Sequence, residues 1–178
     1  MNYQNIAEIY DSNDAIRENL KQMLGKLTDE QCLAVPDGEK WSLAQIVEHV
    51  AAVEEGMTKI CARLLRKAQA DARKSDGAVK LSESFAAKAG EIGKLKLEAP
   101  EMVKPTGEKS VAESLAQLDA NREKLNELRS LFETFDAAEH KFPHPYFGDL
   151  SAHEWLVLIG GHEARHLRQI KNRVEQIN

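Results

Sequence analysis

Ser151-Ala-His-Glu-Trp-Leu-Val-Leu-Ile-Gly-Gly-His162-Glu-Ala-Arg-His166, close to the C-terminal end of the chain, is the stretch of sequence that decides the fold. It begins with a capping box, in which the Ser151 hydroxyl can accept a hydrogen bond from the Glu154 amide while the Glu154 side chain reaches back. The apolar residues that follow recur at helical spacing. The stretch therefore predicts a long helix, which we place at residues 151–175.

Two further capping boxes predict two more long helices. Ser42-Leu-Ala-Gln45 begins a helix expected at residues 42–68, and Ser110-Val-Ala-Glu113 begins one expected at residues 110–137. A first helix, at residues 4–26, is indicated by apolar residues spaced three, four and seven apart: Ile6, Ile9, Ile16, Leu20, Met23 and Leu27. We find no convincing alternating strand, so the expected fold is an all-α bundle of four helices.

The connections between these helices are long for a plain bundle. Residues 28–41 carry a turn signal at Pro36-Asp-Gly38, and residues 138–150 are aromatic and made rigid by prolines. Residues 69–109 are polar and lysine-rich and can hold a short helix around residues 81–93. Connections longer than about 12–15 residues are usually functional, disordered, or long crossovers.

Composition bounds the class of protein. The 178 residues suffice for one domain, placed at residues 1–178, and they contain no apolar run near the ~20 residues of a membrane span. The first twenty residues do not resemble a signal peptide, so we expect a cytoplasmic location. Cys32 and Cys61 share no metal or redox spacing, which favours free thiols. A net charge of −5 argues against nucleic acid as the main partner.

The two histidines of the opening stretch suggest a metal site. His162 and His166 are four residues apart, so both project from one face of a helix and can reach a single cation. His49 lies in another predicted helix. If the two helices are antiparallel, His49 can complete a site of three nitrogen ligands with one open position, which is how catalytic metal sites are built. Each histidine taken alone is more commonly a surface or core residue, so the hypothesis depends on their convergence.

The same residues spell His-Glu-x-x-His, the signature of zinc peptidases. In those enzymes a third metal ligand follows downstream, whereas only twelve residues follow His166 and none of them is a histidine. Arg165 also places a charge between the two histidines, where peptidase helices are normally apolar. With no strand predicted to hold an extended peptide, the peptidase hypothesis is disfavoured.

The residues around the histidines resemble a known family. Trp41-Ser-Leu-Ala-Gln-Ile-Val-Glu-His49, and the segment from His144-Pro-Tyr-Phe-Gly148 through His162-Glu-Ala-Arg-His166 to Ile170, are similar to the two motif regions of the DinB-like (DinB/YfiT-like) superfamily of metal-dependent enzymes. The resemblance covers the four helices and both motif regions, whereas the connection at residues 69–109 is too generic to judge. It implies a four-helix bundle with an up-down-down-up order of helices, which suits the long connections.

That resemblance also implies a function. His49, His162 and His166 would be the ligands of a divalent metal ion, which could be nickel, zinc, iron or manganese. Relatives include S-transferases and isomerases that use low-molecular-weight thiols such as bacillithiol or mycothiol, and a metal-bound water would instead give a hydrolase. The expected partners are a small-molecule substrate and a second copy of the chain in a homodimer, with no nucleic acid and no membrane. The alternative is a metal-holding or structural homodimeric bundle without catalytic activity.

Neighbouring polar residues are weaker candidates. Glu163 could act as a catalytic base, although a surface or supporting role, paired with Arg165 or Arg168, needs no special explanation. A metal-bound histidine normally has its second ring nitrogen hydrogen-bonded, and three residues compete for that role: Gln45, Glu48 and Gln169. His140, His144 and His153 are not expected to be ligands, and His153 should lie on the opposite face of its helix.

Overall fold

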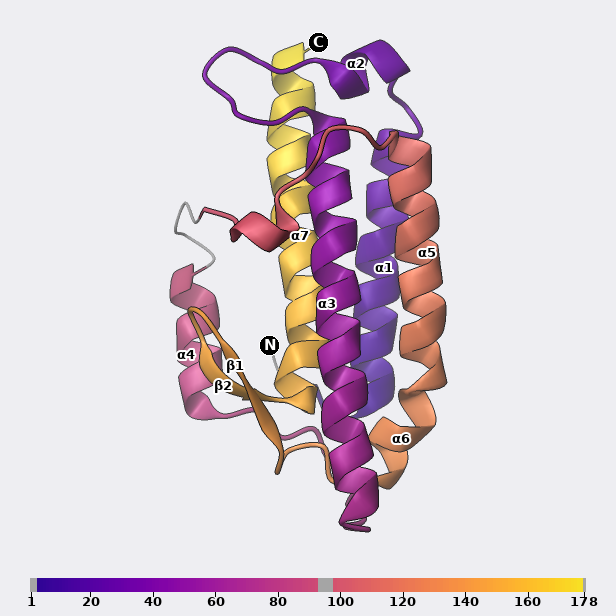
Figure 1. Cartoon of the computed structure of the whole chain (residues 1–178), viewed down its shortest axis with the longest axis vertical. Coiled ribbons are helices and arrows are strands. Elements are labelled where there is room, and N and C mark those ends of the chain that lie inside the picture. Colours follow the sequence, from indigo (N-terminus) through magenta and orange to yellow (C-terminus); the bar gives the residue numbers. More distant parts are fainter. Residues whose placement is uncertain (1–2, 93–97, 178) are drawn as a thin grey trace.

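Four long helices form the body of the molecule in the computed structural model, which describes residues 3–92 and 98–177. They are α1 (Ile6–Leu24), α3 (Leu43–Ala70), α5 (Val111–Glu127) and α7 (Ala152–Ile177). In Figure 1, α1 and α7 run upwards while α3 and α5 run downwards. The predicted all-α four-helix bundle with an up-down-down-up order is therefore confirmed.

Long crossovers connect the helices, as the chain order requires. α3 packs against both α5 and α7, and α1 packs against α7. Because α3 and α5 are parallel neighbours, the chain between them must return along the bundle. It does so through α4 (Glu83–Ile92) and a short 3₁₀ helix, η1 (Glu101–Val103), which lie on the outer side of α7 and α3 in Figure 1. A short α2 (Asp29–Leu33) lies between α1 and α3.

All three predicted capping boxes are present. The Ser42, Ser110 and Ser151 hydroxyls accept hydrogen bonds from the backbone amides three residues later, and the Gln45, Glu113 and Glu154 side chains accept in return from the serine amides. A fourth box, between Thr28 and Gln31, begins α2 and was not predicted. Short-range hydrogen bonds of this kind depend on spacing along the chain, which explains their predictability.

The predicted helix at residues 110–137 is in fact two helices. α5 ends at Glu127, and α6 (Arg129–Thr134) follows after Leu128. The buried Tyr10 hydroxyl donates a 2.7 Å hydrogen bond to the Leu125 carbonyl at this break. The new direction of the chain brings Phe132 edge-on to the Tyr10 ring, with 6.5 Å between ring centroids.

A two-stranded hairpin precedes α7, so the expectation of no strand was wrong. β1 (Lys141–His144) pairs antiparallel with β2 (Gly148–Ser151). Pro143 and Pro145 concealed it from the sequence, because proline usually argues against a strand. In a two-stranded ribbon both strands are edges, so a proline that lacks an N–H donor is tolerated at position 143.

A polar layer divides the apolar core into two clusters. One cluster contains Tyr10, Leu65, Leu125 and Trp155, and the other contains Leu20, Ile46, Leu118 and Ile170. Between them, at corresponding levels of the four long helices, lie buried polar side chains: Asn13, Arg17, Glu54, Asn121, Arg122, Glu163 and His166. No described helix combines the length and apolarity that crossing a bilayer requires.

Gly160 brings α1 and α7 close together within this layer. A Cβ atom at Gly160 would lie 1.9 Å from the Asn13 Oδ1 atom, whereas a Cβ at Gly161 would meet nothing within 4 Å. The Asn13 amide donates a 3.1 Å hydrogen bond to the Leu156 carbonyl of α7. The close approach of α1 to α7 therefore depends on Gly160 and not on Gly161.

Candidate metal centre

His49, His162 and His166 converge between α3 and α7. The centroids of the His162 and His166 rings are 4.6 Å apart, and those rings lie 5.2 and 5.0 Å from His49. One nitrogen atom from each ring lies within 4.8 Å of the other two. Side chains more than a hundred residues apart in the sequence thus meet because α3 and α7 are antiparallel.

The donor set fits a divalent first-row metal ion. Three nitrogens at about 2.1 Å from a tetrahedral ion are about 3.4 Å apart. The nitrogens of this cluster are at most 4.8 Å apart, so small rotations of the imidazole rings suffice to bring them to bonding distance. Imidazole nitrogens suit nickel, zinc and iron, so the ligand type alone does not select one ion.

Hydrogen bonds leave the ligand nitrogens of two histidines free. His49 Nδ1–H donates to the Val103 carbonyl at 2.7 Å, because a carbonyl oxygen can only accept. His166 Nδ1–H donates to Gln169 Oε1 at 2.9 Å. In both rings the Nε2 lone pair is therefore available, with the second nitrogen satisfied as is usual for metal ligands. Gln169 was among the predicted partners, whereas the Val103 carbonyl was not.

Burial keeps all three imidazoles neutral. It lowers the pKa of His49 despite the hydrogen bond to Val103. The pKa of His162 lies well below its usual range, through burial and then through the neighbouring His166 and His49. Burial and the proximity of His49 lower the pKa of His166 to about 4. Metal binding requires neutral imidazole, so the cluster is in the ligating form at neutral pH.

Comparisons with known proteins agree with this architecture. The sequence model of the DinB superfamily matches residues 13–170, which include α3, α5, most of α1 and α7, and the three histidines. The chain belongs to the DinB superfamily.

Two similar proteins match this chain over nearly its whole length. The Uncharacterized protein YuaE of Bacillus subtilis (strain 168) is 29% identical over 166 residues, which are 93% of this chain and 96% of that protein. The crystal structure of TT2238, a four-helix bundle protein, superposes with a TM-score of 0.62 at 26% identity, covering 93% of this chain and 98% of that one. The family and the bundle fold inferred from the sequence are thus both confirmed.

Glu163, the candidate catalytic base, lies away from the histidines and is not a surface charge. Its side chain is buried and forms two hydrogen bonds with Arg17 of α1, at 2.6 Å to Nε and 3.1 Å to Nη2. Arg17 Nη2 also pairs with Glu54 of α3 at 2.6 Å. The expected surface position was wrong because the helix face next to the histidines is covered by α1. A catalytic role for Glu163 stays a prediction.

The other candidate partners have different roles. Gln45 caps α3, and Glu48 accepts hydrogen bonds from Thr106 and Gly107. Burial alone would raise the pKa of Glu48, but these hydrogen bonds outweigh it and hold the pKa below its usual range. Trp41, whose ring lies 5.2 Å from that of His49, is held at its carbonyl by Arg173 of α7.

The remaining histidines are outside the cluster, as predicted. His153 is buried and stacks on Phe132, and its Nδ1 accepts a hydrogen bond from the Lys80 amide. His144 packs against Trp155 at the hairpin, and His140 pairs with Asp71 at 2.7 Å.

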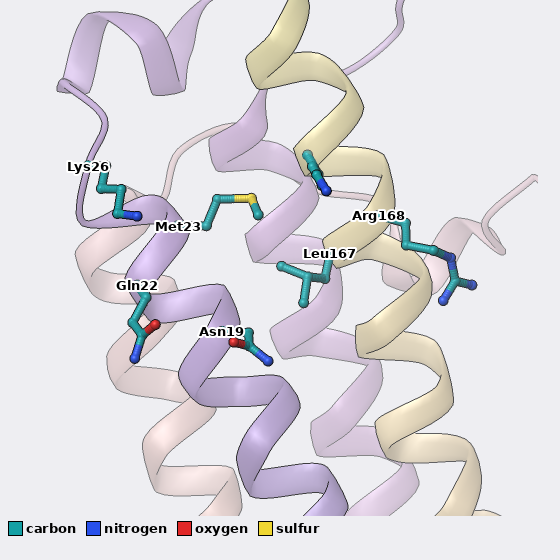
Figure 2. A pocket seen from close by; sticks show the side chains of 7 residues that line it. Asn19, Gln22, Met23, Lys26, Leu167 and Arg168 are labelled. Carbon is teal, nitrogen blue, oxygen red and sulfur yellow. The ribbon is translucent and has the colours of Figure 1, made fainter.

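An open groove on another part of the surface does not belong to the cluster. It measures about 380 Å³ and is lined by residues of α1, by Lys26 just after α1, and by residues of the second half of α7: Asn19, Gln22, Met23, Leu167, Arg168 and Lys171. Figure 2 shows Met23 and Leu167 projecting into the space between the two helices. None of the three histidines lines this groove.

Proposed function

We propose that this DinB-superfamily protein is a metal-dependent enzyme that holds a divalent first-row ion through His49, His162 and His166. The convergence of the three imidazoles carries the proposal. Three protein ligands leave a coordination position open, as in catalytic zinc sites, whereas structural zinc sites are closed by four protein ligands. The substrate would be a small molecule that reaches the open position.

The neutrality of the ligands supports a reaction with an anionic group. Three imidazoles cancel none of the charge of a divalent ion, so an anionic fourth ligand is favoured over a neutral one. When bound, the ion would lower the pKa of a thiol or a water and supply thiolate or hydroxide at neutral pH. The site is therefore suited to thiol S-transfer or to hydrolysis.

The placement of the nearby carboxylates supports S-transfer over hydrolysis. Glu48 and Glu163 are the carboxylates adjacent in sequence to the ligands, and both are already held by hydrogen-bond donors. Neither is free to take a proton from an attacking water. A thiol needs no such base, because its pKa of about 8.5 is already close to neutral pH. We therefore place low-molecular-weight thiols first among the candidate substrates.

Metal analysis tests the binding half of the proposal. Protein purified without added metal should contain close to one equivalent of a first-row ion, or should take up one equivalent of Zn²⁺ or Ni²⁺ in a titration. His49→Ala, His162→Ala and His166→Ala should each lose it. His153→Asn is the matched control, since this histidine of α7 is buried but outside the cluster and the asparagine amide can still accept from Lys80. Retention of stoichiometric metal by all three alanine variants would overturn the site.

An activity panel tests the catalytic half. The metal-loaded protein is incubated with low-molecular-weight thiols and electrophiles, and loss of free thiol is followed against the His162→Ala variant. Turnover that depends on His162 supports the S-transferase, and turnover of ester or amide substrates without thiol supports a hydrolase. Stoichiometric metal without any turnover favours the alternative, a bundle that holds metal for stability.

A further inference from the structure

The crossover between α4 and α5 forms hydrogen bonds with two consecutive residues of α3. Glu48 is buried, and its carboxylate accepts three hydrogen bonds from this segment: from Thr106 N at 3.0 Å, Thr106 Oγ1 at 2.7 Å and Gly107 N at 2.9 Å. His49, the next residue, donates to the Val103 carbonyl at 2.7 Å. We call residues 101–107 the strap.

Polar contacts, more than burial, hold the strap against α3. Met102 is 90% exposed, and only Val103 and Pro105 are half-buried among residues 101–107. The three bonds to Glu48 are charge-assisted, which makes them stronger than bonds between neutral groups. Gly107 has a φ of +79°, and a Cβ there would lie 3.0 Å from Gln45 Nε2, so the strap approaches α3 closely at this point.

We propose that Glu48 is a positioning residue for the metal site: by clamping the strap, it fixes the Val103 carbonyl and through it the tautomer and ring orientation of His49. This inference rests on the metal-binding role proposed above. With the carbonyl in place, His49 carries its proton on Nδ1 and presents Nε2 to the ion. Without it, the proton is shared between the two nitrogens and the ring can turn, so part of the population cannot ligate.

Glu48→Gln is the sharpest variant, because it preserves the shape of the side chain. The glutamine oxygen can still accept from Thr106, but its amide N–H then faces the Gly107 N–H and one hydrogen bond is lost. Loss of an outer hydrogen-bond partner typically weakens metal binding 10–100-fold. Glu48 acts one step further out, so we expect Zn²⁺ binding to weaken about tenfold.

Glu154→Gln is the matched control for a merely structural role. Glu154 is also buried, also clamps a crossover, and also accepts three hydrogen bonds, from Ser82 N at 2.9 Å, Ser82 Oγ at 2.5 Å and Ser151 N at 2.8 Å. Within the described residues, neither Ser82 nor Ser151 is hydrogen-bonded to a metal-site histidine. Its substitution should lower the melting temperature by an amount similar to Glu48→Gln and leave Zn²⁺ affinity within about twofold of wild type.

The experiment compares full-length wild type, Glu48→Gln and Glu154→Gln by two readouts. The ¹⁵N shifts of the His49 ring in metal-free protein report its tautomer, and competition with a chromophoric chelator reports Zn²⁺ affinity. In wild type and Glu154→Gln the proton should be on Nδ1, and in Glu48→Gln the shifts should move towards a mixture. Thr106→Val, which loses one donor and keeps its shape, should give a smaller change and replaces Glu48→Gln if that variant does not fold.

Two outcomes would overturn the proposal that Glu48 positions His49 through the strap. One is an unchanged His49 tautomer with Zn²⁺ affinity within twofold of wild type in Glu48→Gln, or in Thr106→Val if that variant replaces it. The other is an equal loss of affinity in Glu154→Gln, which would make the effect one of general stability. If wild type binds no Zn²⁺, the proposed function fails, but the tautomer in metal-free protein still decides whether Glu48 positions His49.

Discussion

Adjacent residues of α7, His162 and Glu163, belong to two different buried clusters. His162 faces α3 and joins His49 and His166. Glu163 faces α1 and, with Glu54 of α3, holds the Arg17 guanidinium. The first cluster is neutral with free nitrogen lone pairs, whereas the second contains its own counter-charge.

This contrast separates binding from stability within one short motif. The three neutral imidazoles contribute little to folding stability until a cation binds to their free lone pairs. In the second cluster Arg17 is already paired with Glu54 and Glu163, and these ion pairs link three of the four long helices, α1, α3 and α7. Burial, together with the charge of Glu163, outweighs the effect of Arg17 and raises the pKa of Glu54 to about 7. The cluster has two carboxylates for one guanidinium, and the raised pKa of Glu54 favours the protonated form of that second carboxylate.

Removing the central charge of the second cluster should have the largest effect. Arg17→Met leaves two buried carboxylates without a partner, and we expect the free energy of unfolding to fall by about 3–5 kcal/mol. Urea denaturation measures it. Arg122→Met is the control, since its partner Asp14 is mostly exposed and should be less costly to leave unpaired. A loss for Arg17→Met no larger than that for Arg122→Met would contradict the stabilising role of the cluster.

The second-largest effect should come from acid, which should lower the stability of the folded protein by protonating histidines of the first cluster. Because the pKa of His166 is about 4 in the folded protein and near 6.5 in the unfolded chain, the unfolded chain binds more protons between these values. Stability of metal-free protein should therefore fall as pH drops from about 6.5 to about 4, by roughly 3 kcal/mol from His166 alone. Denaturation curves at several pH values measure it against His166→Gln, which should lack this component. Identical pH profiles for the two proteins would refute the shift.

Substituting one residue from each cluster should separate metal binding from folding stability. His162→Ala should weaken Zn²⁺ binding by at least about 100-fold, with a smaller stability loss than Arg17→Met. Glu163→Gln should do the reverse, lowering stability by about 1–3 kcal/mol while Zn²⁺ affinity stays within about threefold. Chelator competition and urea denaturation of both variants give the four values. A large loss of turnover in Glu163→Gln with intact metal binding would instead support the catalytic role predicted for this residue.

The glycines just before the motif should show the smallest contrast. Gly160→Ala pushes a Cβ into Asn13 and should cost about 1–3 kcal/mol. Gly161→Ala meets open space and should be neutral or stabilise α7 by up to about 1 kcal/mol. Thermal denaturation of the two variants measures the difference. Equal melting temperatures would mean that α1 does not approach α7 as closely as the Asn13 contact indicates.

Much of the fold was predictable from short-range patterns. Ser42, Ser110 and Ser151 begin helices because a hydroxyl and an amide three residues later meet in any helical start. His162 and His166 share a face because four residues make about one turn. Other features escaped prediction because they depend on distant contacts. The break at Leu128 accompanies the Tyr10 hydroxyl bond. The β1–β2 hairpin is concealed by Pro143 and Pro145, of which Pro143 is tolerated because it lies in an edge strand.

The sequence by itself determined the four helices, the family and the identity of the three candidate ligands, since each follows from spacing within one segment or from a family motif. The tertiary structure alone decided that His49 meets the α7 histidines, that a main-chain carbonyl at Val103 orients it, and that Glu163 turns inwards to Arg17. These arrangements depend on which helix faces pack together. That choice is made by the burial of all four helices at once, and no single segment encodes it.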